Sequence, residues 1–207
     1  AAAGTDPLDP DSDGDLVGDA DEPGRTGTDP TVADAFGALY LSERDDDAIL
    51  RVSLGDDGLP YGTRTLVSGA ARGTGPTLVN PIGLAAEPGG TLLVVLPGGS
   101  LLRVDPATGD RTLVSGAGVG AGPALDTPTD VVLENGRTAW VLAQGSPDRI
   151  YRVDLATGDR AVALELPSGP APVYGAREAT GDLLVANQGE DTVHRYRPQP
   201  DGTLARV

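Results

Sequence analysis

After residue 35 the chain alternates between short apolar runs and clusters of Gly, Pro, Asp and Asn. The runs are rich in Leu and Val, and none of them shows the 3.6-residue spacing of an amphipathic helix. The first seven runs occupy residues 38–41, 48–54, 64–67, 82–85, 91–96, 100–104 and 111–114. Short strands separated by frequent turn signals predict an all-β fold without a substantial helix.

An internal repeat predicts how these strands are arranged. Ser68-Gly69 recurs as Ser115-Gly116 at a step of 47 residues. The block Arg-Val-Asp-Pro-Ala-Thr-Gly-Asp-Arg at 103–111 recurs with one change, Leu for Pro, at 152–160, a step of 49 residues. Each repeat contains four short runs, and a repeated four-stranded unit of about 45 residues is typical of a β-propeller blade. The sequence therefore predicts four-stranded antiparallel blades around an axis.

The number of repeats predicts an incomplete ring. Residues 36–207 enter at the second strand of one blade and end at the last strand of another, which amounts to about 3.5 to 4 blades. Closed propellers contain about four to eight blades, and an open arc exposes strand edges and half of a core. We therefore expect further C-terminal blades or a second copy of the chain to complete the ring.

Residues 1–35 form a separate acidic segment. Residues 1–34 hold ten carboxylates and one Arg, and their few apolar residues are scattered singly. Without a bound cation such a run of like charges repels itself and behaves as a disordered linker. When a cation is bound, alternate carboxylates on a tight loop converge on it, and a hard cation such as calcium suits these oxygen ligands.

The spacing of the acidic residues predicts a calcium loop that begins at Asp11. Numbered as an EF-hand loop, the ligands are Asp11, Asp13, Asp15, Val17 through its carbonyl, Asp19, and Glu22 as the bidentate ligand. Leu16 departs from this pattern, because position 6 of such a loop prefers Gly. A second register begins at Asp9 and places Gly14 at position 6, but it places Ala20 at position 12. The first register is preferred because it retains the carboxylate of Glu22.

Two parts of the chain resemble known families. With its flanks Gly-Thr-Asp-Pro-Leu-Asp-Pro at 4–10 and Gly-Thr-Asp-Pro-Thr at 27–31, the acidic loop is similar to bacterial thrombospondin type 3 repeats. That resemblance implies calcium binding and a stalk between domains. Residues 38–207 resemble NHL-like and lactonase-like bacterial propellers, in which the Val-Asp-Pro-Ala-Thr-Gly-Asp-Arg-Thr hairpin recurs. That resemblance implies a propeller fold, and for some relatives a metal-dependent hydrolase or a lyase.

Charge and composition narrow the possible functions. The net charge of -16 disfavours nucleic acid and anionic membrane surfaces as partners. The chain has no Cys, which excludes disulfides and thiolate chemistry, and no apolar run long enough to insert into a membrane. We expect an extracellular or cell-surface calcium-binding module that presents a propeller face to a protein or glycan. The alternative is a propeller hydrolase or lyase with a metal in its central channel.

A metal in the central channel needs oxygen ligands from different inner strands. Asp130, Asn187 and Asn80 are the nearest candidates, although turn or strand-entry roles for Asn80 and Asp130 are the simpler interpretation. His194 is the only histidine, and one histidine is too few to predict a triad or a histidine metal site.

Other noticeable residues are expected to be structural. Asp110-Arg111 and Asp159-Arg160 recur at the same point of two blades, so we expect each Asp to bond its own hairpin and each Arg to cover the blade rim. Trp140 and Tyr151 are expected to pack in the core. Residues 45–47, three consecutive Asp, are expected to form a solvated turn, with a second calcium site as the alternative.

Overall fold

The computed structural model describes residues 38–53, 64–167 and 169–207. Within these residues the chain forms fifteen strands and no helix, so none is long and apolar enough to cross a membrane. The strands are β1 (Ala38–Glu43), β2 (Ala48–Ser53), β3 (Arg64–Ser68), β4 (Leu84–Ala86), β5 (Leu92–Leu96), β6 (Ser100–Val104), β7 (Arg111–Ser115), β8 (Pro128–Leu133), β9 (Thr138–Ala143), β10 (Asp148–Asp154), β11 (Arg160–Leu166), β12 (Pro172–Arg177), β13 (Leu183–Asn187), β14 (Thr192–Pro198) and β15 (Leu204–Arg206).

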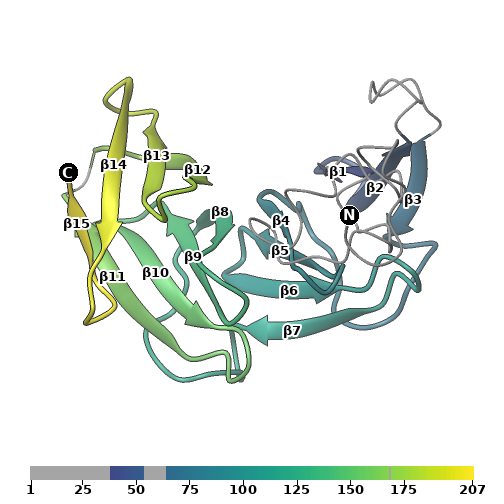
Figure 1. Ribbon diagram of the computed structural model, residues 1–207. Helices are drawn as coiled ribbons and strands as arrows, with labels where there is room; N and C mark the ends of the chain where they lie inside the picture. Colours follow the sequence, from purple (N-terminus) through teal and green to yellow (C-terminus); the bar gives the residue numbers. More distant parts are fainter. Residues whose placement is uncertain (1–37, 54–63, 168) are drawn as a thin grey trace, which may run out of the picture.

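The strands form four antiparallel sheets in which each strand pairs with the next one along the chain. The first sheet contains β1 to β3, the second β4 to β7, the third β8 to β11 and the fourth β12 to β15. The sheets follow one another around an arc, with β4, β8 and β12 on its concave side (Figure 1). This arrangement confirms the all-β fold and the four-stranded blades of a partial β-propeller.

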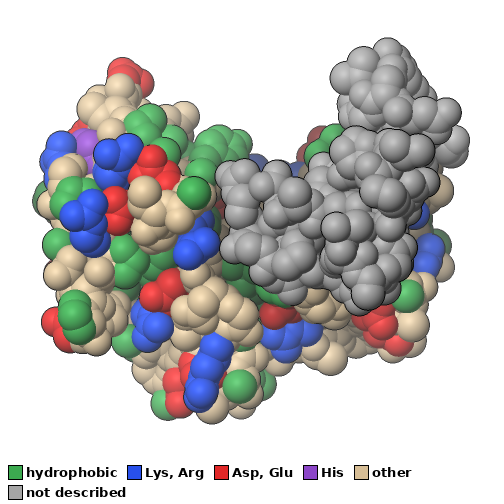
Figure 2. Space-filling view, viewed as in Figure 1, with side chains coloured by type: hydrophobic (Ala, Val, Ile, Leu, Met, Phe, Trp, Pro, Cys, Tyr) green, Lys and Arg blue, Asp and Glu red, His purple; other side chains and the backbone are tan. Residues whose placement is uncertain are grey.

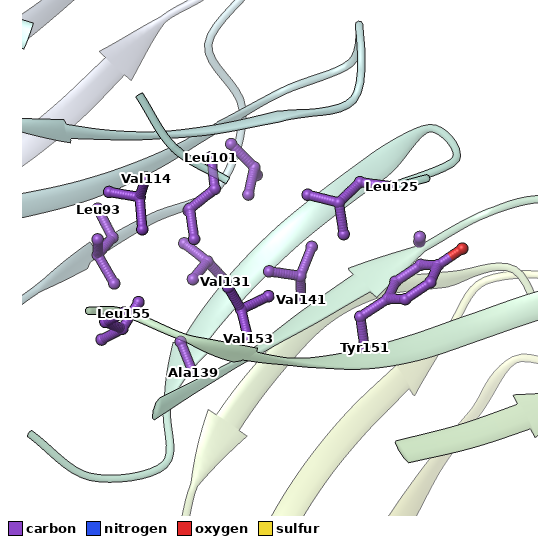
Figure 3. Packing of buried hydrophobic residues seen from close by; sticks show 12 residues of the cluster. Leu93, Leu101, Val114, Leu125, Val131, Ala139, Val141, Tyr151, Val153 and Leu155 are labelled. Carbon is purple, nitrogen blue, oxygen red and sulfur yellow. The ribbon is translucent and has the colours of Figure 1, made fainter. Parts of the chain in front are cut away.

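Apolar side chains fill the space between successive sheets. One cluster joins the first sheet to the second, another the second to the third, and another the third to the fourth. Figure 3 shows the middle cluster, in which Leu93 and Leu101 of the second sheet face Val141 and Tyr151 of the third. Trp140 is 1% exposed and Tyr151 is fully buried, which confirms that both are core residues. The second and third sheets are thus apolar on both faces, because each of them is covered on both sides.

The recurring hairpin forms for a local reason. Asp105 begins the turn after β6, and its carboxylate accepts a hydrogen bond from the backbone amide of Ala107 (2.8 Å). Gly109 closes the turn at φ 83°, a conformation that side chains disfavour. Asp154 and Gly158 repeat both features after β10.

The recurring Asp-Arg pair links neighbouring sheets. Asp110 accepts from the amide of Thr74, in the loop that leaves the first sheet (2.7 Å). Arg111 is buried, and its guanidinium donates to Ser68 Oγ (2.7 Å) and to the carbonyl of Pro76 (2.6 Å). The structural role is confirmed. The expected partners were wrong, because the loop after each outer strand folds over the hairpin of the next sheet.

The second pair repeats this arrangement between the next two sheets. Asp159 accepts from the amide of Ala121 (2.7 Å), and Arg160 donates to Ser115 Oγ (2.7 Å). Each Asp-Arg pair therefore belongs to an interface between sheets, which explains why it recurs at the same point of the second and third sheets.

Acidic and basic side chains are interspersed on the described surface shown in Figure 2. Part of this pattern is a repeated ion pair between the turn after an inner strand and the third strand of the same sheet. Glu87 binds Arg103, and Glu178 binds Arg195 at 2.7 and 2.8 Å. Sequence reasoning overlooked these pairs, although the repeat of Glu87 as Glu134 and of Arg103 as Arg152 was a usable signal.

Candidate functional site: the concave face

The inner segments of the last three sheets enter the concave face in the same way. Asn80, Thr127 and Ala171 have φ of 49°, 43° and 50°, and each precedes a proline. Proline disfavours the right-handed helical conformation of the preceding residue. The left-handed residue turns the chain from the outer edge of one sheet into the inner strand of the next.

Asp130 on β8 lies where the three inner segments meet. Its Oδ2 accepts a hydrogen bond from the amide of Gly175 on β12 (2.8 Å), and its Oδ1 accepts from the amide of Val131 (2.9 Å). On the other side, a Cβ added to Gly83 would lie 2.4 Å from Asp130 Cα and 2.5 Å from Oδ1. Glycine at position 83 is therefore what allows the carboxylate to lie between neighbouring blades.

Burial raises the pKa of Asp130 to about 6, although its bonds to the amides of Gly175 and Val131 act in the opposite direction. Removing a carboxylate from water disfavours its charged form, and here this effect exceeds the two hydrogen bonds. A carboxyl group that titrates near pH 6 can gain and lose a proton under ordinary conditions.

The raised pKa predicts a specific dependence of stability on pH. An aspartate in an unfolded chain titrates at about 3.9, so between pH 3.9 and about 6 the native state binds more protons than the unfolded state. The contribution of Asp130 to the free energy of unfolding is fully present below pH 3.9 and is lost as pH rises through 6. A shift of two units corresponds to about 3 kcal/mol.

Denaturant unfolding of the wild type and Asp130→Asn at pH 4 and pH 7 measures this effect. We expect the wild-type advantage over the variant to be larger at pH 4 by about 2 to 3 kcal/mol. Subtracting the variant removes the opposite contribution of carboxylates such as Asp182, whose pKa is lowered by its bond to Arg197. Parallel pH profiles would contradict the assignment.

The three proposed channel ligands make different contacts, and only Asp130 is a carboxylate. Asn80 donates its backbone amide to Asp47 Oδ1 (2.7 Å), which makes it a strand-entry residue as the simpler interpretation expected. Asp130 already uses both oxygens on backbone amides. The described residues also contain no cluster of three His, Asp or Glu side chains placed to hold a metal. With a single carboxylate among the three candidates, these residues do not fit a central metal ion.

Asn187 lies elsewhere, at the end of β13. It is 2% exposed, its Nδ2 donates to the carbonyl of Val185 (3.4 Å), and its Oδ1 has no hydrogen-bond partner within the described residues. It lines a cavity of about 380 Å³ on the outward side of the fourth sheet, together with Tyr174, Asp191 and Val193. The sequence did not predict this cavity, because its walls come from three different strands and a turn.

The remaining candidates have structural explanations or lie outside the described residues. His194 is buried, with Nδ1 3.2 Å from Tyr196 Oη and Nε2 3.7 Å from a Glu190 oxygen. Of the three consecutive Asp residues, Asp45 and Asp46 are exposed in the turn, and Asp47 receives the Asn80 amide. The acidic segment at 1–35 lies outside the described residues, with the predicted calcium ligands Asp11, Asp13, Asp15, Val17, Asp19 and Glu22.

Comparison with solved structures supports the class of fold. The chain is similar to a gluconolactonase from Xanthomonas campestris (TM-score 0.63, 17% identity), covering 82% of this chain and 57% of that one. It is also similar to virginiamycin B lyase from Staphylococcus aureus (TM-score 0.59, 14% identity, 82% and 51% covered). A third similar chain comes from a nidogen/laminin complex (TM-score 0.59, 17% identity, 78% and 57% covered).

These neighbours are lactonase-like and NHL-type propellers, so the chain has the fold of part of a β-propeller. The chain spans between half and three fifths of the length of these structures. No protein-family model matches the sequence, and a comparison with curated proteins found no match. At these identities the likeness shows the fold, while function has to be argued from the site.

Proposed function

We propose that the chain is the site-bearing part of a propeller hydrolase or lyase of the lactonase type, with its reaction on the concave face. The observation that carries this proposal is Asp130, a buried carboxylate on an inner strand whose pKa is raised to about 6. Support comes from similar folds that include a gluconolactonase and a streptogramin lyase. The substrate class suggested by these neighbours is a small lactone or other cyclic ester.

The chemistry assigned to Asp130 is proton transfer. A group with a pKa near the working pH can both accept a proton from water or substrate and return it. Backbone amides from β8 and β12 hold the two carboxylate oxygens, so the side chain keeps one orientation. Strongly shifted carboxylates of this kind are found preferentially at functional sites.

A second candidate function is a binding scaffold outside the cell, as the composition suggested. The observation that favours it is the similar chain from a nidogen/laminin complex, a propeller structure that was solved with a protein partner. In this form of the proposal the concave face binds a protein or glycan. The acidic segment binds calcium through Asp11, Asp13, Asp15, Val17, Asp19 and Glu22 and serves as a tether.

Hydrolysis of glucono-1,5-lactone by the whole chain, followed as acid release, tests the first proposal. We expect Asp130→Asn to lower the rate by about 10²- to 10⁴-fold, the usual contribution of a general acid or base. Wild-type activity should change with pH around 6, and the variant should lose that dependence.

Asp45→Asn is the matched control, because Asp45 is an exposed carboxylate in a turn. We expect it to retain wild-type activity. Circular dichroism melts of both variants show whether they are folded at the assay temperature. Lactone hydrolysis no faster than the spontaneous rate, or full activity of a folded Asp130→Asn variant, would overturn the hydrolase proposal.

A further inference from the structure

The outward face of the fourth sheet exposes a position that is buried in every other sheet. Ile49, Leu101 and Ile150 begin the strand next to the outermost one in the first three sheets, and each is fully buried under the following sheet. Val193 has the same place on β14, near its start, and is 66% exposed. Tyr174 on the inner strand β12 of the same sheet is 67% exposed. We call this surface, made by Tyr174, Ala186 and Val193, the leading face.

The first sheet has the complementary surface at the other end of the arc. Leu39 and Leu41 on β1 are 42% and 36% exposed. Their equivalents on β5, Leu92 and Val94, are fully buried against the preceding sheet. We call the surface made by Leu39 and Leu41 the trailing face. The arc therefore carries both halves of the interface that already repeats three times within it.

The leading face also carries an acceptor of the kind used between sheets. Asp47, in the turn before β2, accepts the amide of Asn80, which starts the next inner segment (2.7 Å). Asp148 does the same for Ala171 (2.9 Å). Asp191 has the place of Asp47 in the turn before β14, with φ 52° against 50°. Asp191 lines the 380 Å³ cavity beside Val193.

The repeated junction indicates what fits these faces. At each of the three junctions inside the arc, the leading side of one sheet packs on the trailing side of the next, so the chain carries both surfaces of a contact that a second copy can complete. The ends of the arc lie on either side of its open concave side (Figure 1). Two copies related by a two-fold axis would place each leading face on the trailing face of the other copy. The result is a closed ring of eight sheets, within the known range of propellers.

We propose that the leading face of one chain binds the trailing face of a second copy, so that two chains close one propeller ring. The contact is head-to-tail and occurs twice, and the pair of Val193 and Leu41 lies at its centre. The supporting pattern is that the equivalent pairs, such as Leu101 with Val141, share one core cluster at each internal junction. In such a dimer the inner strands of both copies surround one central channel. This inference does not depend on the proposed catalytic activity.

Light scattering coupled to size exclusion, at several concentrations of the whole chain, tests the proposal. We expect a plateau at twice the 20.9 kDa mass of one chain. Val193→Asp and Leu41→Asp should each convert the dimer to monomer. Val79→Asp is the matched control, since Val79 is 48% exposed but lies between the first and second sheets. It should leave the dimer intact.

Crosslinking distinguishes this geometry from others and does not depend on how well the Asp variants fold. The chain has no cysteine, so Val193→Cys and Leu41→Cys each introduce a single thiol. A short bismaleimide should crosslink a mixture of the two variants into a covalent dimer, and neither variant alone. Crosslinking of one variant with itself, a wild-type monomer at all concentrations, or polymers without a plateau at the dimer would overturn the proposal.

Discussion

Replacing Gly120 by Ala is expected to lower the free energy of unfolding by more than 4 kcal/mol, a loss seen only for severe structural conflicts. Gly120 has φ 73°, and a Cβ on it would lie 1.8 Å from the carbonyl oxygen of Gly158. The backbone of residue 120 fixes the position of the Cβ, and the oxygen belongs to the backbone of Gly158. No side-chain rotation can therefore relieve the collision. The loop after the second sheet would have to leave the hairpin of the third, and the bond from Ala121 to Asp159 would be lost with it.

Gly118→Ala in the same loop separates the collision from the cost of the backbone conformation. Gly118 has φ 83°, but a Cβ on it would meet no atom within 4 Å. We expect a loss of about 1 to 2 kcal/mol, the cost of a left-handed conformation with a side chain. Urea unfolding followed by circular dichroism measures both variants. Equal losses would show that the close approach of Gly120 to Gly158 does not exist in solution.

Trp140→Ala is expected to lower the free energy of unfolding by about 3 to 5 kcal/mol. Trp140 is 1% exposed and packs with Ile150 and Tyr196 in the cluster between the third and fourth sheets. Its removal leaves a cavity between the third and fourth sheets. The Asp-Arg pairs at 110–111 and 159–160 link the two other interfaces but not this one. The variant contains no tryptophan, so unfolding has to be followed by circular dichroism.

Val79→Ala is the control for the tryptophan variant. Val79 is an apolar residue between the first and second sheets, and it is 48% exposed. A change at an exposed side chain usually alters stability by less than about 0.5 kcal/mol. A loss for Trp140→Ala as small as that for Val79→Ala would show that the third and fourth sheets do not pack as described.

The repeat allowed most of the fold to be predicted from the sequence. Apolar runs separated by turn residues define strands, and recurrence of the same hairpin at 103–111 and 152–160 identifies the blade. These are local patterns, repeated at nearly constant spacing. The same information could not show that Arg111 is buried against Ser68 and Pro76, because its partners come from the preceding sheet.

The candidate site was predicted only in part. Asp130 was named as a candidate channel ligand, with a turn or strand-entry role as the simpler interpretation. Its carboxylate is buried between Gly83 and Gly175, about 45 residues away on either side, and this burial raises its pKa. Asn187 and Asn80 were grouped with it because a channel metal needs oxygen ligands from different inner strands. Asn80 binds Asp47 through its backbone amide and Asn187 lines a cavity of the fourth sheet, and a pattern of residue types encodes neither contact.

For this chain, the sequence alone determined the strands, the four-stranded blade and the incomplete number of blades, because each depends on neighbours in the chain or on a fixed repeat. The tertiary structure decided which of the residues at equivalent positions in different blades are buried and which are exposed. Ile49 and Val193 hold the same place in their blades, yet one is fully buried and the other is 66% exposed. The physical reason is that a residue in a propeller is buried by the neighbouring sheet. Within the described arc, the first and fourth sheets each have a neighbouring sheet on one side only.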